Sequence, residues 1–138
     1  MIYGVGIDII EVSRVRAVFK RHGSRAKNRI LTKAEQAQCR RRKDPSQHIA
    51  GLFAAKEAVL KAIGIGFARG ARWRDIEIRP DALGRPIVHL SGKTALEAKK
   101  RNIAIFHLSI SHTAEHAVAQ VVAAKGAEPA RRRKGIKR

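Results

Sequence analysis

The chain has 138 residues, of which 44% are hydrophobic and 30% are charged. This length suits one domain with a hydrophobic core, and the composition is globular rather than disordered. No apolar run approaches the roughly 20 residues of a membrane-spanning helix. The single cysteine, Cys39, excludes an internal disulfide and any zinc site built from cysteines. We therefore expect no membrane association and a reducing, cytoplasmic location.

Positive charge is the feature that departs most from an ordinary composition. The chain carries 30 Lys and Arg against 11 Asp and Glu, for a net charge of +19. Such a field attracts anionic partners, which include nucleic acid, acidic proteins, phosphorylated cofactors and anionic lipid. Aromatic residues make up only 4%, which is few for stacking on unpaired bases. Charge alone does not choose among these partners.

The first predicted element is a strand over residues 2–10. The two-residue period places four apolar side chains on one face, namely Tyr3, Val5, Ile7 and Ile9. Gly4 and Gly6 lie on the other face beside Asp8. The glycines either clear space beside the carboxylate or allow another backbone to pack closely. The sequence leaves both interpretations open.

Three helices are predicted next, from the N-cap Ser13 to about His22, over 33–43, and over about 47–63. The third has an apolar stripe that contains Lys56, a position where lysine is rare unless it is paired or reaches solvent. Glu57 and Lys61 lie four apart on one edge of this helix. Their spacing suits an ordinary surface ion pair as well as a functional pair above a cleft.

The rest of the chain alternates short apolar runs with turns. We predict strands over 73–79 and 87–90, a helix over 91–101, and a closing hairpin with strands over 103–111 and 117–123. Residues 1–124 are expected to form the domain, and residues 125–138 a basic, disordered tail. The sequence leaves open whether the tail binds a protein, binds nucleic acid or does neither.

Asp8 and Glu57 are carboxylates within otherwise apolar segments. Two carboxylates, completed by water and substrate phosphate oxygens, are a usual way for proteins to hold Mg²⁺. Basic surroundings suit a phosphorylated substrate. The chain has no nucleophile elbow, zinc-binding helix motif or dinucleotide-binding fingerprint. The residues therefore favour Mg²⁺-dependent chemistry on a phosphorylated compound, although their spacing does not show that the two carboxylates meet.

Three segments in order resemble the holo-[acyl-carrier-protein] synthase family, the small 4′-phosphopantetheinyl transferases of bacterial fatty-acid biosynthesis. They are Gly-Val-Gly-Ile-Asp-Ile-Ile-Glu at 4–11, Phe-Ala-Ala-Lys-Glu-Ala at 53–58 with Lys61, and Ser-Ile-Ser-His-Thr at 109–113. The likeness covers about residues 1–123. Each motif alone is modest, but the three in this order are specific.

The resemblance implies a fold and a reaction. The fold is α+β, a small antiparallel sheet wrapped by helices, which assembles as a homotrimer with active sites shared between neighbouring subunits. The reaction is Mg²⁺-dependent transfer of the 4′-phosphopantetheine arm of coenzyme A to a serine of apo acyl carrier protein. Adenosine 3′,5′-bisphosphate is the other product.

The resemblance also assigns site residues. It implies that Asp8 and Glu57 hold Mg²⁺, that Lys61 adds positive charge at the leaving phosphate, and that Glu57 or a water it holds accepts the serine proton. The implied coenzyme A contacts are Lys61, Arg85, Pro86, Ser109, His112 and Thr113. The implied contacts to the acidic carrier protein are Arg14, Arg21 and Arg25.

Leu52 and Lys56 stand out beside this resemblance. Leu52 stands where relatives often carry a basic residue, so one coenzyme A phosphate contact is expected either to be lost or to move to the basic block 40–43. Lys56 is expected at a subunit boundary.

Two other classes of protein fit parts of this sequence. A small RNA- or ribosome-associated module would explain the charge and the tail, but it has no use for Asp8 and Glu57. A protein that binds coenzyme A without transfer would not need Glu57 and Lys61.

Overall fold

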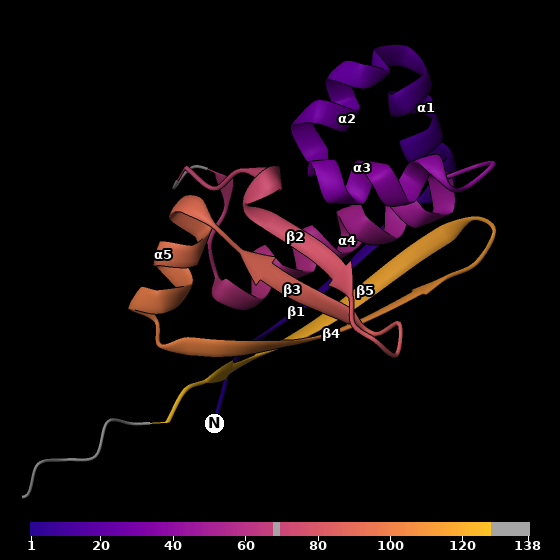
Figure 1. Cartoon of the computed structure of the whole chain (residues 1–138). Helices are drawn as coiled ribbons and strands as arrows, with labels where there is room; N and C mark the ends of the chain where they lie inside the picture. The colour runs from indigo at the N-terminus through magenta and orange to yellow at the C-terminus, as the bar shows by residue number, and fades with distance from the viewer. Residues whose placement is uncertain (68–69, 128–138) are drawn as a thin grey trace, which may run out of the picture.

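The computed structural model describes residues 1–67 and 70–127 and has an α+β architecture (Figure 1). The elements in chain order are β1 (Ile2–Glu11), α1 (Val12–His22), α2 (Ser24–Ile30), α3 (Lys33–Arg40), α4 (Ser46–Ile63), the 3₁₀ helix η2 (Trp73–Asp75), β2 (Ile76–Pro80), β3 (Pro86–Leu90), α5 (Gly92–Lys100), β4 (Ile103–His112) and β5 (His116–Lys125). The predicted fold class is confirmed.

The main sheet has three antiparallel strands in the order β1-β5-β4, and β2 and β3 form a separate two-stranded hairpin. The long helix α4 packs against β1 and β5. Two glycines of β1 permit this close approach. A Cβ atom at Gly4 would collide with the carbonyl oxygen of Ala62, and one at Gly6 with that of Ala58. Close backbone packing is therefore the role of the glycines, and it brings Asp8 of β1 beside α4.

The face of the sheet that points away from α4 is apolar and uncovered in the single chain. The side chains Val5, Ile7 and Ile9 are 57%, 60% and 66% exposed. In the strand register Val5 lies opposite Val122 of β5, which lies opposite His107 of β4. The predicted alternation in β1 is confirmed, and its apolar side chains lie on the outer face of the sheet.

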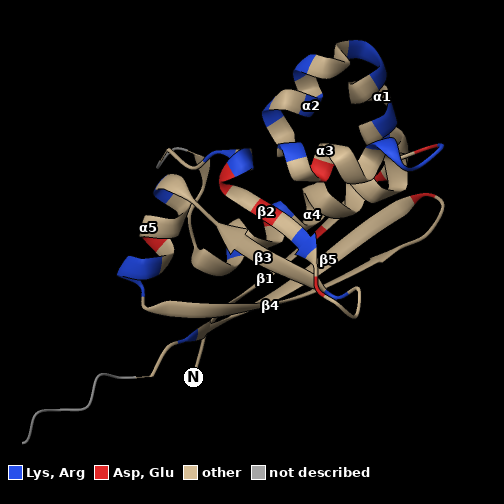
Figure 2. Ribbon diagram, in the orientation of Figure 1, with Lys and Arg blue, Asp and Glu red and all other residues tan. Residues whose placement is uncertain are grey.

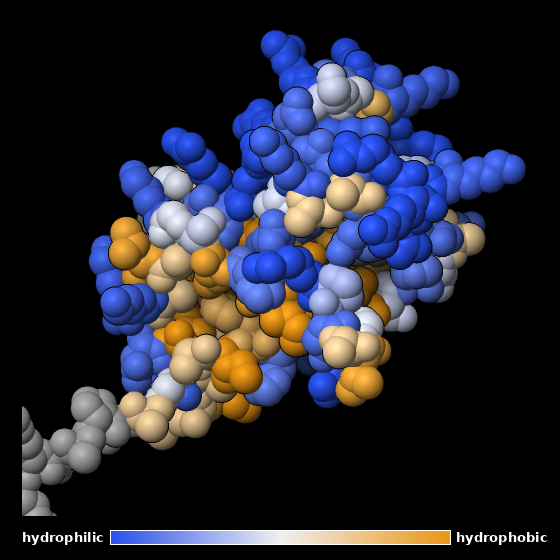
Figure 3. Space-filling model, in the orientation of Figure 1, coloured by the Kyte–Doolittle hydropathy of each residue, from blue (hydrophilic) through white to orange (hydrophobic). Residues whose placement is uncertain are grey.

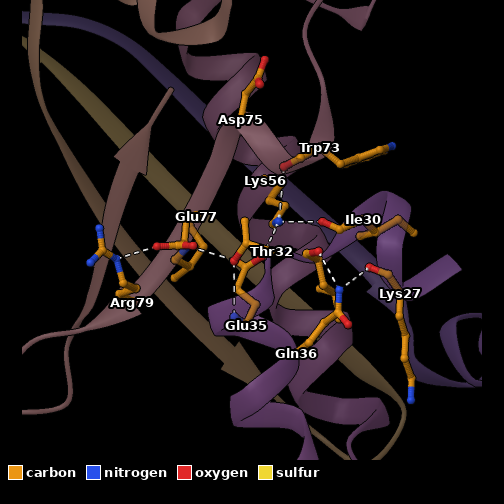
Figure 4. A network of polar contacts seen from close by, with 12 residues as sticks. Lys27, Ile30, Thr32, Glu35, Gln36, Lys56, Trp73, Asp75, Glu77 and Arg79 are labelled. Atoms are coloured by element: carbon orange, nitrogen blue, oxygen red, sulfur yellow. Dashed lines mark hydrogen bonds and ion pairs between the residues drawn. The ribbon is translucent and has the colours of Figure 1, made fainter. Parts of the chain in front are cut away.

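A buried ion pair joins α3 to α4 in the core (Figure 4). The Nζ atom of Lys56 lies 2.6 Å from Oε1 of Glu35, and both side chains are 0% exposed. Burial lowers the pKa of the Lys56 ammonium, and the carboxylate of Glu35 opposes that shift. Removing one partner of such a pair typically costs about 3–5 kcal/mol, because an uncompensated charge is left buried. Lys56 therefore lies in the core of one chain, and its expected place at a subunit boundary is wrong.

Local structure differs from the prediction at the start of two elements. Helix α1 begins at Val12 directly after β1, with Glu11 as its N-cap and no side-chain cap, so the prediction of Ser13 as the cap is wrong. The backbone N–H of Val12 donates instead to the carbonyl of Glu115 at 2.8 Å. The strand predicted from residue 73 begins at Ile76, because the Asp75 carboxylate accepts the N–H of Arg72 and folds the preceding residues into η2.

The helical part of the chain also differs in extent. Helix α2 was not predicted, since only Ala26 of its seven residues is buried and no apolar period marks it. Helix α3 ends at Arg40, short of the predicted residue 43. The predicted tail over 125–138 starts at the last residue of β5, and residues 128–138 lie outside the described part. Within the described part, no helix has both the length and the hydropathy to cross a membrane.

Candidate active site

A cavity of about 420 Å³ lies where β1, α1 and α4 meet. Four ionisable side chains line one part of it, namely Asp8, Arg14, Glu57 and Lys61. The remaining wall is mostly apolar, with Val15, Val18, Phe19, Ile30 and Phe53 among its residues. The fold thus brings together the two carboxylates and the lysine that the sequence motifs singled out, from segments about 50 residues apart.

Lys61 bonds to β1 rather than to its neighbour on α4. Its Nζ donates to the carbonyl oxygen of Ile7 at 2.9 Å and to Oδ1 of Asp8 at 3.2 Å. No ion pair involves Glu57 among the residues that the structure describes. The Glu57–Lys61 surface pair that the helical spacing allowed is therefore not formed, and Lys61 connects α4 to the backbone of the strand.

The Glu57 carboxyl group is held in an unfavourable setting for its charge. Burial raises its pKa, the nearby carboxylate of Asp8 raises it further, and Lys61 opposes both effects. The charge of Asp8 therefore acts on the Glu57 carboxyl group, although burial is the larger cause of the shift. A raised pKa at a cavity is also typical of groups that bind cations or move protons.

This donor set fits a hard divalent cation that takes its remaining ligands from elsewhere. Mg²⁺ commonly uses one or two carboxylates and fills its other positions with water and substrate phosphate oxygens. No cluster of three or more His, Cys, Asp or Glu side chains suited to a metal exists in the described ranges. Asp8 and Glu57 can therefore contribute to such a site and cannot complete it alone.

A second cavity, of about 710 Å³, contains part of the predicted coenzyme A contacts. Pro86 and His112 line it. Arg41 and Arg42 of the basic block 40–43 line it too, together with residues that the sequence analysis did not assign to the site, among them Gln38, Gln47, His48 and Ile78. Apolar walls with a basic rim suit a nucleotide that carries phosphate groups.

His48 is a side chain in this cavity that sequence reasoning missed. Its Nε2 atom is buried without a hydrogen-bond partner among the described residues. Burial lowers the pKa of His48, and the charges of Arg42 and His112 lower it further. The available signal was its helical spacing, because His48 lies one turn before Leu52 on the same side of α4.

The two cavities share no lining residue and open on nearly opposite sides of α4. At 100° per residue, His48, Gly51 and Leu52 form one side of the helix. Phe53, Glu57 and Lys61 form the other. A single chain therefore does not bring the predicted coenzyme A contacts Pro86 and His112 to the carboxylates.

Three further predicted contacts do not line the second cavity. Ser109 is exposed and, in the register of the sheet, lies opposite Gln120 in the row that continues to Ile7 on the outer face. Thr113 is in the β4–β5 turn, where its carbonyl oxygen accepts a hydrogen bond from Gln47 at 3.2 Å. Arg85 is exposed and pairs with Asp81 at 3.0 Å.

The predicted carrier-protein contacts lie on the helices that project from one end of the molecule, where basic residues gather (Figure 2). Arg14 and Arg21 belong to α1 and Arg25 to α2, and all three are exposed. Between residues 13 and 43 the chain has twelve Lys and Arg and a single acidic residue, Glu35, which is buried. Hydrophilic side chains cover this end, whereas apolar ones gather toward β3 and β4 (Figure 3). We name α1, α2 and α3 the helical arm.

Comparison with known proteins agrees with this architecture. The model of the 4′-phosphopantetheinyl transferase superfamily matches residues 4–121. A holo-[acyl-carrier-protein] synthase of Protochlamydia amoebophila is 47% identical over 123 residues, which are 88% of this chain and 98% of the relative. The chain therefore belongs to the 4′-phosphopantetheinyl transferase superfamily and, within it, to the holo-[acyl-carrier-protein] synthases.

Solved structures of this family are similar in fold. A holo-[acyl-carrier-protein] synthase from Neisseria meningitidis is 35% identical and superposes with a TM-score of 0.83, over 91% of this chain and all of that one. One from Bacillus anthracis, solved in complex with coenzyme A (3′,5′-ADP), is 40% identical with a TM-score of 0.76. That match covers 91% of this chain and 99% of that one.

Proposed function

We propose that this enzyme transfers the 4′-phosphopantetheine arm of coenzyme A to a serine of apo acyl carrier protein and releases adenosine 3′,5′-bisphosphate. The observation that carries this proposal is the cluster of Asp8, Glu57 and Lys61 at one cavity. This cluster occurs in a chain that belongs to the holo-[acyl-carrier-protein] synthase family.

The residues at the first cavity have separate tasks in this transfer. The serine oxygen attacks the phosphorus that carries the arm, and the bond from that phosphorus to the adenosine bisphosphate breaks. Lys61, held against β1 through Ile7 and Asp8, offers positive charge where negative charge builds on the leaving phosphate. Glu57, or a water that it holds, accepts the serine proton.

Mg²⁺ is the metal that fits this donor set. Asp8 and Glu57 would hold it, and the ion would offset charge on the pyrophosphate of coenzyme A. The charge of Asp8 raises the pKa of Glu57, and a cation bound between the two carboxylates would offset this repulsion, which supports the assignment.

We also propose that each active site forms between two copies of the chain. In one chain the cavity with Pro86 and His112 and the cavity with Asp8 and Glu57 open on opposite sides of α4. A coenzyme A molecule that touches both sets must therefore bridge neighbouring chains. The apolar outer face of the sheet, with Val5, Ile7 and Ile9 exposed, supports association into the homotrimer that the family resemblance implies.

The coenzyme A phosphates are expected to meet Arg41 and Arg42. Leu52 is 3% exposed and lines the second cavity as an apolar residue, so it offers no charge there. Arg41 and Arg42 line the same cavity. They supply the positive charge that a basic residue at position 52 would otherwise give.

The acidic carrier protein is proposed to dock on the helical arm through Arg14, Arg21 and Arg25. Arg14 also lines the cavity with Asp8, so a carrier bound there would present its serine near the carboxylates. This partner accounts for the charge of the arm without a nucleic acid. A cytoplasmic location accompanies this function and agrees with the one cysteine, Cys39, which is buried as a thiol.

Intact-mass spectrometry of apo acyl carrier protein tests the transfer. The carrier is incubated with this protein, coenzyme A and Mg²⁺, and a parallel sample contains EDTA. We expect a gain equal to one phosphopantetheine arm with Mg²⁺ and no gain with EDTA. No gain with several acidic carriers, from a folded protein, would contradict the proposal, and a gain that persists in EDTA would contradict the role of the metal.

A further inference from the structure

The buried pair Lys56–Glu35 has no place in either cavity. Neither residue lines the cavity of Asp8 or the cavity of Pro86. Both side chains are fully buried, and a buried ion pair is a poor source of stability, since well-packed apolar residues often serve as well or better. Its geometry, rather than its contribution to stability, is therefore the feature to explain.

The pair fixes four separate segments to α4 (Figure 4). The ammonium of Lys56 donates to the carbonyl oxygens of Ile30 at 2.7 Å and of Trp73 at 3.3 Å, in addition to Glu35. The carboxylate of Glu35 accepts the backbone N–H of Thr32 at 2.9 Å and that of Ile78 at 2.9 Å. The network thus joins the end of α2, the start of α3, η2 and β2.

One of these segments forms a wall of the cavity that contains Asp8, and a second packs behind another wall residue. Ile30, whose carbonyl Lys56 holds, lines that cavity. Trp73, whose carbonyl Lys56 also holds, stacks its ring on Phe53 with centroids 4.7 Å apart, and Phe53 lines the same cavity. Lys56 therefore controls the shape of the cavity from behind its walls, one residue before Glu57.

The same contacts determine where the helical arm lies. Helices α1 and α2 carry Arg14, Arg21 and Arg25; they follow β1 directly at Val12, and they connect to α3 through residues 30–32. The network holds this connection at Ile30 and Thr32. A shift there would move the arginines relative to Glu57 and Lys61, which are fixed on α4 itself.

We propose that Lys56 and Glu35 are positioning residues that set the helical arm against α4 and thereby determine how well the carrier protein is bound and aligned. This inference rests on the proposed docking of the carrier on the arm. It predicts that removing the Lys56 contacts to Ile30 and Trp73 affects the carrier protein more than coenzyme A, because neither residue lines the second cavity, whereas Ile30 lines the cavity of Asp8.

The first test is Lys56→Met, which keeps the length of the side chain and removes its three donated hydrogen bonds. Folding is checked by circular dichroism, and both KM values are measured below the melting temperature. The KM for apo acyl carrier protein is expected to rise about tenfold, with the KM for coenzyme A within about twofold. The control Lys99→Met removes one exposed lysine of α5 and should change neither value.

Glu35→Asp is the second variant, and it decides the matter if Lys56→Met does not fold. It keeps both charges but shortens the carboxylate side chain, which then cannot reach both Lys56 and the N–H of Ile78. The KM for the carrier is expected to rise about threefold, and the KM for coenzyme A by a smaller factor, since Ile78 lines the second cavity. Trp73 is the only tryptophan of the chain, so its emission gives a second readout and should shift in both variants.

The outcomes separate positioning from stability. A pair that only stabilises the fold would lower the amount of active enzyme, so kcat would fall and both KM values would stay the same. That result in a folded variant, or an equal rise of both KM values, overturns the proposal. If Arg14→Glu and Arg21→Glu leave the KM for the carrier unchanged, the docking on the arm fails and the positioning role fails with it. If the arginine variants raise the KM for the carrier and Lys56→Met and Glu35→Asp do not, the carrier docks on the arm, and only the positioning role of Lys56 and Glu35 is wrong.

Discussion

Lys61 of α4 donates a hydrogen bond to Asp8 of β1 at 3.2 Å, although Glu57 lies one turn before it on the same helix. Asp8 thereby has a cationic partner, whereas Glu57 faces the cavity with a raised pKa. The three residues of the cluster are therefore not equivalent, and each can be tested by its own change.

The carboxylates are tested by Asp8→Asn and Glu57→Gln. Each change keeps the shape of the side chain and removes the charge that would hold Mg²⁺, so turnover should fall by about a hundredfold or more. Glu115→Gln, an exposed site in the β4–β5 turn, is the matched control. Turnover is measured as carrier-protein mass gain with time, and near-normal activity of either variant would show that the carboxylate is not needed.

The interaction between the carboxylates gives a prediction about pH. Because burial and Asp8 both raise the pKa of Glu57, its ionised form is less favourable in the folded protein than in the unfolded chain. The metal-free protein should therefore lose stability from Glu57 as the pH rises from the pKa of this group in the unfolded chain through its higher pKa in the folded protein. Asp8→Asn should lower the pKa of Glu57 and Lys61→Met should raise it.

Carboxyl ¹³C NMR of the metal-free protein measures this pKa directly. Shifts in the opposite directions, or no shift with Asp8→Asn, would mean that the two carboxyl groups do not interact across the cavity.

The docking surface is tested by reversing charge on the helical arm. Arg14→Glu and Arg21→Glu should each raise the KM for the acidic carrier by about tenfold and leave the KM for coenzyme A within about twofold. The effect should shrink at high salt, because exposed charges are screened. Lys99→Glu on α5 is the matched control. Equal effects on the two substrates would argue against docking at this surface.

The close packing of β1 on α4 is tested by Gly6→Ala. The new Cβ would collide with the backbone carbonyl of Ala58, so the free energy of unfolding should fall by about 1–3 kcal/mol. Gly66→Ala is the control, since a Cβ there meets no other atom and should change stability by less than about 1 kcal/mol. Urea titration measures both, and an equal loss in the two variants would contradict the packing argument.

The sequence predicted the elements that carry a clear apolar period and missed those that do not. The strand β1 and the helix α4 were identified from their patterns, whereas α2 was missed because one buried residue in seven gives no period. Lys56 was recognised as unusual by its place in an apolar stripe. Its partner Glu35 lies 21 residues away, on a different helix, and no local pattern connects the two.

The candidate site shows the same limit. That Asp8 and Glu57 belong together came from resemblance to a family, because their meeting depends on how β1 crosses α4, which the contacts of Gly4 and Gly6 determine. His48 was missed although it lies one helical turn before Leu52, because that spacing does not show which side of α4 lines a cavity. The separation of the two cavities emerged only from the three-dimensional structure.

A complementation experiment tests the site as a whole most directly. One chain carries Glu57→Gln, the other carries Arg42→Ala with His112→Ala, and mixed assemblies are isolated through two different tags. If each site takes its carboxylates from one chain and its coenzyme A contacts from the next, the two parents should be nearly inactive. Each isolated mixed trimer then has one intact site of three and should recover about a third of the unmodified activity in the carrier-protein mass assay. A mixed assembly no more active than its parents would contradict a site shared between chains.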